Sequence, residues 1–237
     1  MKFSNQIWAF IPARSGSKSI KNKNILKINN VHLIGYSIKF AKKLKKISKI
    51  IFSSDSNKYL AIAKKYGCEN LVLRKKSLSL DDTPDVEVFY SYVKNLISKK
   101  KTLPKYFLHL RPTTPIRSKK DFNNALNLFL KNKNKFSSLR SVSKMSNPSY
   151  KTMRIVNKKL CSLFNKDFDM DKLNAPKEKF PVTYVPNGQF DFIKTENILK
   201  KIFHGKKVLP FITSGFCSDI DDIEDFKKVS MFIKKNR

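Results

Sequence analysis

Cysteine is scarce in this sequence, and the few thiols are not spaced to bind a metal or to build a disulfide framework. There are three, Cys68, Cys161 and Cys217, and no two of them form a CxxC pair. Cysteine-held metal clusters and disulfide-rich scaffolds both depend on closely spaced cysteines. The sequence therefore predicts small, mostly buried thiols without a chemical role.

Long hydrophobic runs are also lacking. The first apolar run covers only residues 7–11, and no stretch of about eighteen apolar residues occurs. The amino-terminal residues do not lead into the apolar core of a signal peptide. We therefore expect a cytoplasmic protein that has no membrane partner.

Acidic residues are few: 18, against 50 Lys and Arg, which gives a formal net charge of +32. A basic nucleic-acid-binding protein is therefore the alternative from a different functional class. However, the lysines are spread along the whole chain, and no zinc-finger spacing, basic region with heptads or RNA-binding aromatic motif accompanies them. We expect no specific nucleic-acid partner, and we expect the positive surface to attract small anions.

What is present is an alternation of apolar strand patterns and amphipathic helix patterns, in a chain long enough to bury a sizeable core. This alternation predicts an α/β fold, three-layer and Rossmann-like, with a mostly parallel sheet and helices on both faces. We expect one domain over residues 1–237, with an inserted arm at about 143–186, where the alternation weakens. The main strands are expected at 7–11, 47–52, 69–73, 106–110, 136–142, 190–193 and 208–212, and the helices at 33–44, 57–66, 85–99, 119–130, 195–203 and 222–234.

The first predicted strand opens into a segment suited to a triphosphate. Its glycine allows close approach of the backbone, and its hydroxyls and cations suit phosphate oxygens. A solvated lysine-rich loop is the simpler alternative, but loops that follow the strands of open α/β sheets are where ligands bind. The segment matches neither the Walker pattern nor GxGxxG. Its polar residues and glycine are Arg14, Ser15, Gly16, Ser17, Lys18, Lys21 and Lys23.

Near the carboxyl end, five of the 18 acids fall within seven residues. Asp219 and Asp221, two apart in an extended segment, point the same way and can share a hard cation such as Mg²⁺. The other three, Asp222, Glu224 and Asp225, suit the first turn of a helix. Helix capping by all five acids is the alternative. A metal next to a triphosphate loop is typical of nucleotide enzymes.

The three histidines, His32, His109 and His204, stand alone in the sequence. None has a neighbouring Ser or Cys together with an acid, so a nucleophilic triad is not expected. We interpret His109, inside an apolar strand, as a residue of the core or of a site wall.

Motifs at residues 11–24, 51–55, 73–74, 82–83, 110–117, 186–188 and 219–221 carry a resemblance to a known family. The first of them, IPARSGSKSIKNKN, is close to the signature IPARGGSKGIPxKN. On these motifs, which follow the same order over nearly the whole chain, the protein resembles the acylneuraminate cytidylyltransferases, or CMP–sugar-acid synthetases.

The resemblance implies transfer of CMP from CTP to the anomeric hydroxyl of an anionic α-keto sugar acid, with release of pyrophosphate. It also implies Mg²⁺ or Mn²⁺ as cofactor, and a homodimer whose arm reaches across the partner. Nucleotide contacts would fall on Ala13, Arg14, Ser15, Gly16, Ser17, Lys18, Asn24, Arg74 and Asp82. Sugar-acid contacts would fall on Arg111, Thr113, Thr114, Lys177 and Asn187. Catalytic roles would fall on Arg14, Lys23 and Asp221, with Asp221 as proton acceptor, and the metal would be held by Asp219 and Asp221.

Two departures from the family pattern concern the acceptor. Where the sialic-acid enzymes have QPTSP, this chain has RPTTP at residues 111–115, and in the arm Lys177 stands where an arginine is common. Arginine grips a carboxylate with two bonds and lysine is a point charge, so recognition of the sugar acid can differ. Legionaminate, pseudaminate and an octulosonate remain open as acceptors. The other enzyme alternative is a nucleotidyltransferase that acts on a sugar phosphate or another small acceptor.

Overall fold

The computed structural model describes residues 1–164 and 169–236. Within them, the core is a seven-stranded sheet in the order β11-β7-β10-β6-β1-β4-β5. Every neighbouring pair is parallel except those made by β10, which runs antiparallel to both β6 and β7. The strands are β1 (Phe3–Pro12), β4 (Ile47–Ser54), β5 (Asn70–Leu73), β6 (Leu103–His109), β7 (Ser138–Lys144), β10 (Tyr184–Lys194) and β11 (Val208–Ile212).

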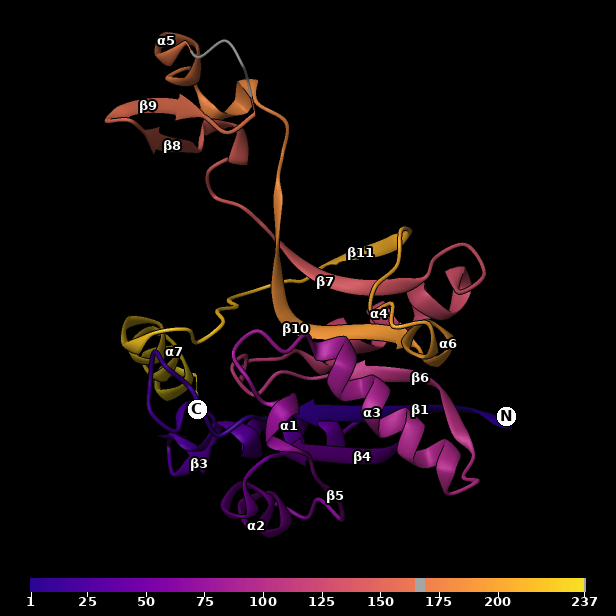
Figure 1. Ribbon diagram of the computed structural model, residues 1–237. Coiled ribbons are helices and arrows are strands. Elements are labelled where there is room, and N and C mark those ends of the chain that lie inside the picture. Colours follow the sequence, from indigo (N-terminus) through magenta and orange to yellow (C-terminus); the bar gives the residue numbers. More distant parts are fainter. Residues whose placement is uncertain (165–168, 237) are drawn as a thin grey trace.

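Helices cover both faces of the sheet (Figure 1). On one face lie α1 (Leu33–Lys42), α2 (Asn57–Lys65) and α4 (Lys119–Asn132), and on the other lie α3 (Asp85–Ser98) and α6 (Thr195–Leu199). Alternate residues of β1 explain the two cores: Ala9 packs with the first set of helices and Phe10 with the second. The predicted three-layer α/β architecture is confirmed.

The carboxyl edge of the sheet is covered by short elements and the last helix. These are η1 (Lys23–Ile25), β2 (Lys27–Ile28), β3 (Val31–His32), η2 (Lys76–Leu78) and α7 (Ile223–Lys235). A small third core, with Ile28, Leu33, Ile220 and Val229, joins α7 to the amino-terminal half of the chain. The last helix is thereby held beside the loop that follows β1 (Figure 1).

Side-chain caps begin several of the helices. Ser56 accepts a hydrogen bond from the backbone of Tyr59 at the start of α2, and Ser118 does the same at the start of α4. Asp222 and Asp225 form a capping box at α7, which agrees with the interpretation of these acids as helix-start residues. The cap of α2 is Ser56 and not the preceding Asp55.

Some predicted boundaries are wrong because tertiary pairing extends or shortens the elements. The strand β10 begins at Tyr184, inside the segment predicted to be the arm, because it pairs with β7 up to the match of Tyr184 with Lys144. The strand β1 begins four residues earlier than predicted and pairs there with β6. The helix predicted at 195–203 ends at Leu199.

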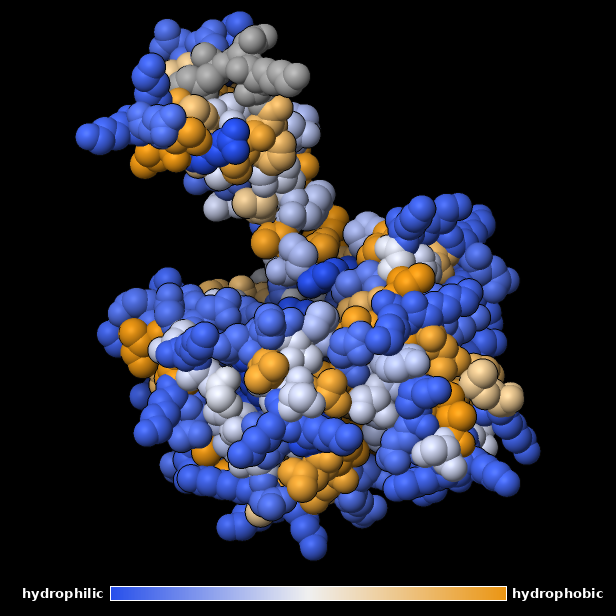
Figure 2. Space-filling model, in the orientation of Figure 1, coloured by the Kyte–Doolittle hydropathy of each residue, from blue (hydrophilic) through white to orange (hydrophobic). Residues whose placement is uncertain are grey.

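Beyond this paired ribbon, an arm projects away from the sheet (Figure 1). It holds the hairpin of β8 (Met153–Val156) and β9 (Lys159–Ser162), with the short helices η3 (Ser149–Lys151), α5 (Met170–Leu173) and η4 (Lys177–Lys179). Residues 165–168 of the predicted arm lie outside the described residues. Figure 2 shows apolar side chains on the arm and on its neck, whereas the body is mostly covered by hydrophilic residues. The exposed apolar residues of this region include Ile155, Val156, Leu160, Leu163, Phe164, Met170 and Val182.

Two further features follow from burial and helix length. Cys68 is buried, but Cys161 and Cys217 are only half-buried, and all three are free thiols, so the prediction of mostly buried cysteines is correct for one of them. In residues 1–164 and 169–236, no helix combines the length and the apolar character needed to cross a bilayer.

Candidate active site

A cavity of about 320 Å³ opens at the carboxyl edge of the sheet. Its walls come from the loops that follow β1, β5 and β6, and from one residue of the acidic segment after β11. The carboxyl ends of parallel strands meet at one edge, which is why segments far apart in sequence converge here. Six of the residues that the sequence assigns to substrates or metal line this cavity: Arg14, Asn24, Arg74, Arg111, Thr113 and Asp219.

Two cations of the first loop share one carboxylate. Arg14 Nη1 lies 2.5 Å from Asp81 Oδ1, and Lys18 Nζ lies 2.6 Å from Asp81 Oδ2. The hydrogen bond from Lys18, helped by Arg14, lowers the pKa of Asp81, and the same contact raises the pKa of Lys18. Asp81 therefore contacts the loop in which the sequence predicts triphosphate binding. The predicted residue Asp82 is exposed and does not line the cavity.

The hydrogen-bond donors of this loop divide into two groups. Ser15 donates its backbone N–H and its hydroxyl to Asp55, at 2.9 and 2.7 Å, and the backbone N–H of Ala13 donates to Ser53. Burial would raise the pKa of Asp55, but the two bonds from Ser15, together with a backbone hydrogen bond of Asp55 itself and the charge of Arg74, outweigh burial and lower it. Ser15 and Ala13 thus hold the loop in place, and Gly16 and Ser17, which make no hydrogen bond with other described residues, are the donors left for a ligand.

Asn24 and Arg74, which the sequence assigns to the nucleotide, form part of the cavity wall. The amide of Asn24 donates to the carbonyl oxygen of Arg14 at 3.0 Å, while its own oxygen is buried without a partner among the described residues. Arg74 Nε donates to the hydroxyl of Ser79 at 2.8 Å, and burial lowers the pKa of this guanidinium. Both side chains therefore retain unused hydrogen-bonding capacity at the cavity wall.

The acidic pair is shaped by the residue between its members. Ile220 is fully buried, and its backbone N–H donates to the carbonyl oxygen of Thr113 at 2.9 Å. Because side chains alternate along an extended segment, Asp219 and Asp221 turn away from this core contact. Asp219 lines the cavity, and Asp221 is 80 % exposed with Oδ1 3.4 Å from Lys23 Nζ.

These two carboxylates fit a magnesium site that the substrate would complete. Magnesium in nucleotide enzymes is typically bound by one or two carboxylates together with phosphate oxygens. In the described residues, no group of three or more His, Cys, Asp or Glu side chains is placed to bind a metal by itself. The oxygen donors of Asp219 and Asp221, next to a loop rich in cations, match the chemistry of a shared hard cation.

A glycine on the antiparallel strand keeps Asp219 in place. Gly188 has φ +67°, and a Cβ built on it would lie 2.7 Å from Thr114 Oγ1. That hydroxyl donates to Asp219 Oδ1 at 3.3 Å. The buried Thr114 thus acts on the cavity through Asp219, and neighbouring Arg111 reaches the cavity with Nη2 3.2 Å from Asp85 Oδ2.

Two predicted sugar-acid residues are placed differently. The Asn187 amide donates to the hydroxyls of Ser143 and Thr213, and its oxygen accepts from the hydroxyl of Ser141 and the backbone of Gln189. As it stands, the Asn187 side chain has no hydrogen-bonding capacity left for a ligand and instead ties β10 to β7. Lys177 lies on the arm, in a separate hollow with Lys144 and Phe180.

Several residues that shape the site are missed at the sequence level. Arg117 donates to the carbonyl oxygens of Arg111 and Gln189, which fastens the loop after β6 to β10, and burial lowers its pKa to about 9. Asp81 is adjacent to the predicted Asp82, and an Asp-Asp pair in a loop does not reveal which member faces inward. Asp191 could have been recognised in the sequence, because a charged residue inside a buried apolar strand needs a polar or charged partner.

With this geometry established, comparison with known proteins identifies the family. Residues 8–180 match the family model for cytidylyltransferases. The chain belongs to the cytidylyltransferase family. It is therefore classed as a nucleotidyltransferase, as the sequence motifs predict.

Two curated relatives of this cytidylyltransferase chain span almost all of it. It is 32% identical over 235 residues to the N-acylneuraminate cytidylyltransferase of Escherichia coli O18:K1:H7, covering 98% of this chain and 53% of the relative. It is 26% identical over 228 residues to the pseudaminic acid cytidylyltransferase of Campylobacter jejuni serotype O:2, covering 95% of both. The chain thus spans about half the length of the first relative and nearly all of the second.

A solved structure shows the same fold. The structure of CMP:2-keto-3-deoxy-manno-octonic acid synthetase complexed with CTP superposes with a TM-score of 0.68 and 13% identity, covering 98% of this chain and 100% of that one. At this identity, the likeness establishes the architecture of the sheet and its helices.

Proposed function

We propose that the chain transfers CMP from CTP to the anomeric hydroxyl of an α-keto sugar acid and releases pyrophosphate. One observation carries the proposal: residues that the motifs assign to nucleotide, sugar acid and metal meet in one cavity. Arg74 represents the nucleotide set, Arg111 the sugar-acid set and Asp219 the metal pair. The names of the curated relatives, which refer to N-acylneuraminate and pseudaminic acid, support a nonulosonate acceptor.

The first loop would bind the triphosphate. Arg14 and Lys18 now hold Asp81, and exchanging this carboxylate for phosphate groups gives both cations a more highly charged partner. Negative charge grows on the transferred phosphoryl group and on the departing pyrophosphate. Cations held in position before the reaction stabilise that charge without reorganising, which lowers the barrier.

The acceptor would be positioned by Arg111, whose guanidinium can bind the carboxylate of a sugar acid with two hydrogen bonds. The hydroxyl oxygen would then attack the α-phosphorus, and the bond to the pyrophosphate oxygen would break with its electron pair. For the hydroxyl proton we propose Asp221, which stands at the rim beside Lys23. Holding two anions in line is the main contribution of such a site.

We further propose that Asp219 and Asp221 hold Mg²⁺ or Mn²⁺. When bound there, the metal would neutralise phosphate charge and help to orient the triphosphate. The role of the protein would be to present Asp219 in the cavity wall and Asp221 in the exposed segment next to it, with Lys23 balancing the charge of Asp221.

We also propose that the protein works as a homodimer in the cytoplasm, where CTP is available. The exposed apolar residues of the arm, among them Ile155 and Phe164, support a contact with a second copy. Through such a contact, Lys177 of the arm could reach a site that it does not reach within one chain. Sedimentation at micromolar concentration should give a dimer, and a monomer would contradict this assembly.

The function is tested by pyrophosphate release with each of the four nucleoside triphosphates, together with Mg²⁺ and a panel of α-keto sugar acids. We expect turnover with CTP and one or more nonulosonates, and a CMP-sugar product of the corresponding mass. Turnover with GTP or UTP but not with CTP would overturn the proposal. Turnover with a sugar phosphate alone would favour the alternative of a nucleotidyltransferase that acts on sugar phosphates.

A further inference from the structure

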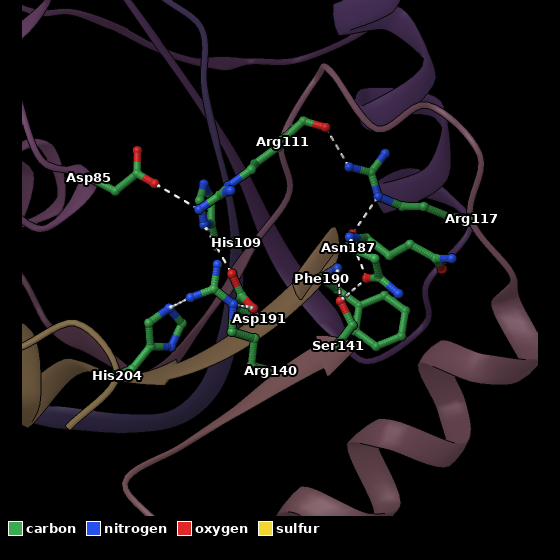
Figure 3. Close-up of polar contacts among 11 residues, drawn as sticks. Asp85, His109, Arg111, Arg117, Arg140, Ser141, Asn187, Phe190, Asp191 and His204 are labelled. Carbon is green, nitrogen blue, oxygen red and sulfur yellow. Dashed lines mark hydrogen bonds and ion pairs between the residues drawn. The ribbon is translucent and has the colours of Figure 1, made fainter. Parts of the chain in front are cut away.

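Four polar side chains from separate elements gather in one place (Figure 3). They are His109 at the end of β6, Arg140 on β7, Asp191 on β10 and His204 after α6. His109 Nδ1 lies 3.6 Å from Asp191 Oδ2, and Arg140 Nε lies 3.8 Å from Asp191 Oδ1. Arg140 Nη1 contacts His204 Nε2 at 3.1 Å. We call these four residues the polar cluster.

The polar cluster has more hydrogen-bonding atoms than it uses. The side chain of His109 is 0 % exposed and that of Asp191 is 3 % exposed. Even so, both ring nitrogens of His109, Asp191 Oδ1 and Arg140 Nε make no hydrogen bond with the described residues. Three of these atoms belong to the two ion pairs given above, which leaves His109 Nε2 as the one without a polar contact there. Buried polar atoms are nearly always paired, because an unpaired one loses its water and gains nothing. The buried His109 Nε2, which lacks any such partner, therefore indicates a polar ligand group.

The position of the polar cluster assigns it to the acceptor. His109 lines the cavity together with Arg111 and Asp219. The predicted nucleotide residues follow β1 and β5, whereas His109, Asp191 and Arg140 lie on β6, β10 and β7, on the other side of β1 in the sheet. A ligand group that reaches His109 therefore comes from the half of the cavity that contains Arg111.

The charges of the polar cluster define the kind of group that fits. The carboxylate of Asp191 disfavours a second carboxylate, for which Arg111 is the better partner. A methyl group, such as the end of an N-acetyl substituent, would leave the same atoms unpaired. Within the cluster, Asp191 Oδ1 and Arg140 Nε face each other, so the atom without a polar contact is His109 Nε2. A hydroxyl group can donate a hydrogen bond to a ring nitrogen that acts as an acceptor.

The tautomer of His109 follows from its neighbour. With Asp191 beside Nδ1, the proton of a neutral imidazole is favoured on that nitrogen, which leaves Nε2 as an acceptor. The rings of Phe89 and Phe203 pack edge-on against the imidazole and restrict its rotation. His109 is thus a fixed acceptor, with Asp191 and Arg140 as positioning residues behind it.

We propose that His109, positioned by Asp191 and Arg140, binds a hydroxyl substituent of the acceptor, so that the enzyme selects sugar acids that carry a hydroxyl there over those that carry an N-acyl group or hydrogen. The inference rests on the proposed function and specifies the acceptor class of that same cavity. It separates this chain from an enzyme whose pocket is apolar at the same place.

The test compares matched pairs of acceptors with CTP and Mg²⁺. One pair of 3-deoxy-nonulosonic acids differs only in hydroxyl against acetamido at C5, and another differs in hydroxyl against hydrogen at C9. For at least one pair, kcat/KM should favour the hydroxyl compound by at least about 100-fold, because a site built around a buried hydrogen bond strongly rejects an analogue that lacks it. Ratios near one in every pair, or preference for the acyl compounds, would overturn the inference but not the function.

Variants locate the source of the preference. The double variant His109→Leu with Asp191→Leu removes both buried partners together, a change that proteins often tolerate without loss of stability. It should keep its KM for CTP and lose the hydroxyl preference, so that the ratio falls to within about tenfold of one. Unchanged ratios in this variant would overturn the assignment of the hydroxyl to the polar cluster.

Two further variants separate positioning from simple structural support. Asp191→Asn keeps an oxygen that can orient the imidazole and should retain part of the acceptor ratio, whereas Asp191→Leu should lose it. As a matched control, Asp121→Asn alters another buried carboxylate, which binds Ser214 away from the cavity, and should leave the ratio unchanged. An equal loss of ratio in Asp121→Asn would overturn the inference. Absence of CTP turnover with every sugar acid would instead overturn the proposed function, and this inference with it.

Discussion

The Asp81 carboxylate holds the Arg14 guanidinium at 2.5 Å and also holds Lys18, so a negative side chain occupies the loop that is proposed to bind phosphate. The three residues lie on two loops that follow different strands, β1 and β5. For a triphosphate to reach these cations, Asp81 has to release them. On the proposed function, the ion pair would compete with the nucleotide.

Replacing Asp81 with Asn should strengthen nucleotide binding. The variant keeps the shape of the side chain and removes the competing charge, so we expect the KM for CTP to fall about two- to fivefold, the modest size typical of exposed ion pairs. Steady-state kinetics at constant ionic strength would measure it. A rise in KM would show that Asp81 itself contacts the nucleotide or its metal.

The acidic segment offers a second test with a built-in control. Asp221→Asn and Asp219→Asn should each lower Mg²⁺-dependent turnover by roughly 100-fold or more, because a charge aimed at the reacting phosphate is lost. Asp222→Ala should instead lower stability by about 1 kcal/mol through loss of the α7 cap, with turnover preserved. Initial rates over a range of Mg²⁺ concentrations and urea midpoints distinguish the two effects. Near-normal rates in Asp221→Asn would mean that this residue holds no metal.

Gly188 and Gly215 form a matched pair for the support of Asp219. Both have positive φ, +67° and +77°, so alanine is strained to a similar degree at either position. Only at Gly188 would the new Cβ meet Thr114 Oγ1, at 2.7 Å, whereas nothing lies within 4 Å at Gly215. Gly188→Ala should therefore lower kcat roughly ten- to a hundredfold through displacement of Asp219. Equal kcat values in the two variants would contradict this role.

Acidification should destabilise the fold through the polar cluster. Burial lowers the pKa of His204 below 6.5. In the unfolded chain this histidine takes up a proton near that pH, so the free energy of unfolding falls as the pH drops below it, by at most about 1.4 kcal/mol per pH unit.

Asp191 adds to this loss at lower pH. Burial alone would raise its pKa, but the contacts with His109, His204 and Arg140 outweigh it and lower the pKa below 3.8. The stability that Asp191 contributes is present above that pH and is lost as the pH falls through the folded-state pKa.

The measurement is the urea midpoint between about pH 7.5 and pH 5. His204→Gln should flatten the slope in this range. His32→Gln is the control. Burial also lowers the pKa of His32, but this histidine is less buried, so the variant should flatten the slope less than His204→Gln does. A slope unchanged in His204→Gln would disprove the assignment.

Much of the fold could be predicted because its signals are local. The alternation of apolar residues along β1 places Ala9 and Phe10 on opposite faces whatever the rest of the chain does. Ser56 and Ser118 mark helix starts by their own hydroxyls. Strand ends were less predictable, since Tyr184 joins β10 only because Lys144 of β7 is there to pair with it.

The site, like the fold, could be predicted only in part. Residue types suited to phosphate and to a hard cation, such as Arg14 and Asp219, stand out in the sequence because their chemistry is rare in this chain or unusually placed. Which hydrogen bonds these residues make depends on the tertiary structure. Asn187 illustrates this, since its motif suggests a ligand contact while its side chain is fully engaged by Ser141, Ser143, Thr213 and Gln189.

The sequence by itself determined the layered α/β architecture, the cation-rich loop after the first strand and the acidic pair near the end, because each depends on residues close together in the chain. Only the tertiary structure decided that Asp81 pairs with Arg14, that Gly188 supports Asp219 through Thr114, and that His109 meets Asp191. These contacts join residues that lie from 67 (Arg14 to Asp81) to 105 (Thr114 to Asp219) positions apart in the chain. The contacts depend on burial and on strand order, and neither can be derived from a single stretch of the sequence.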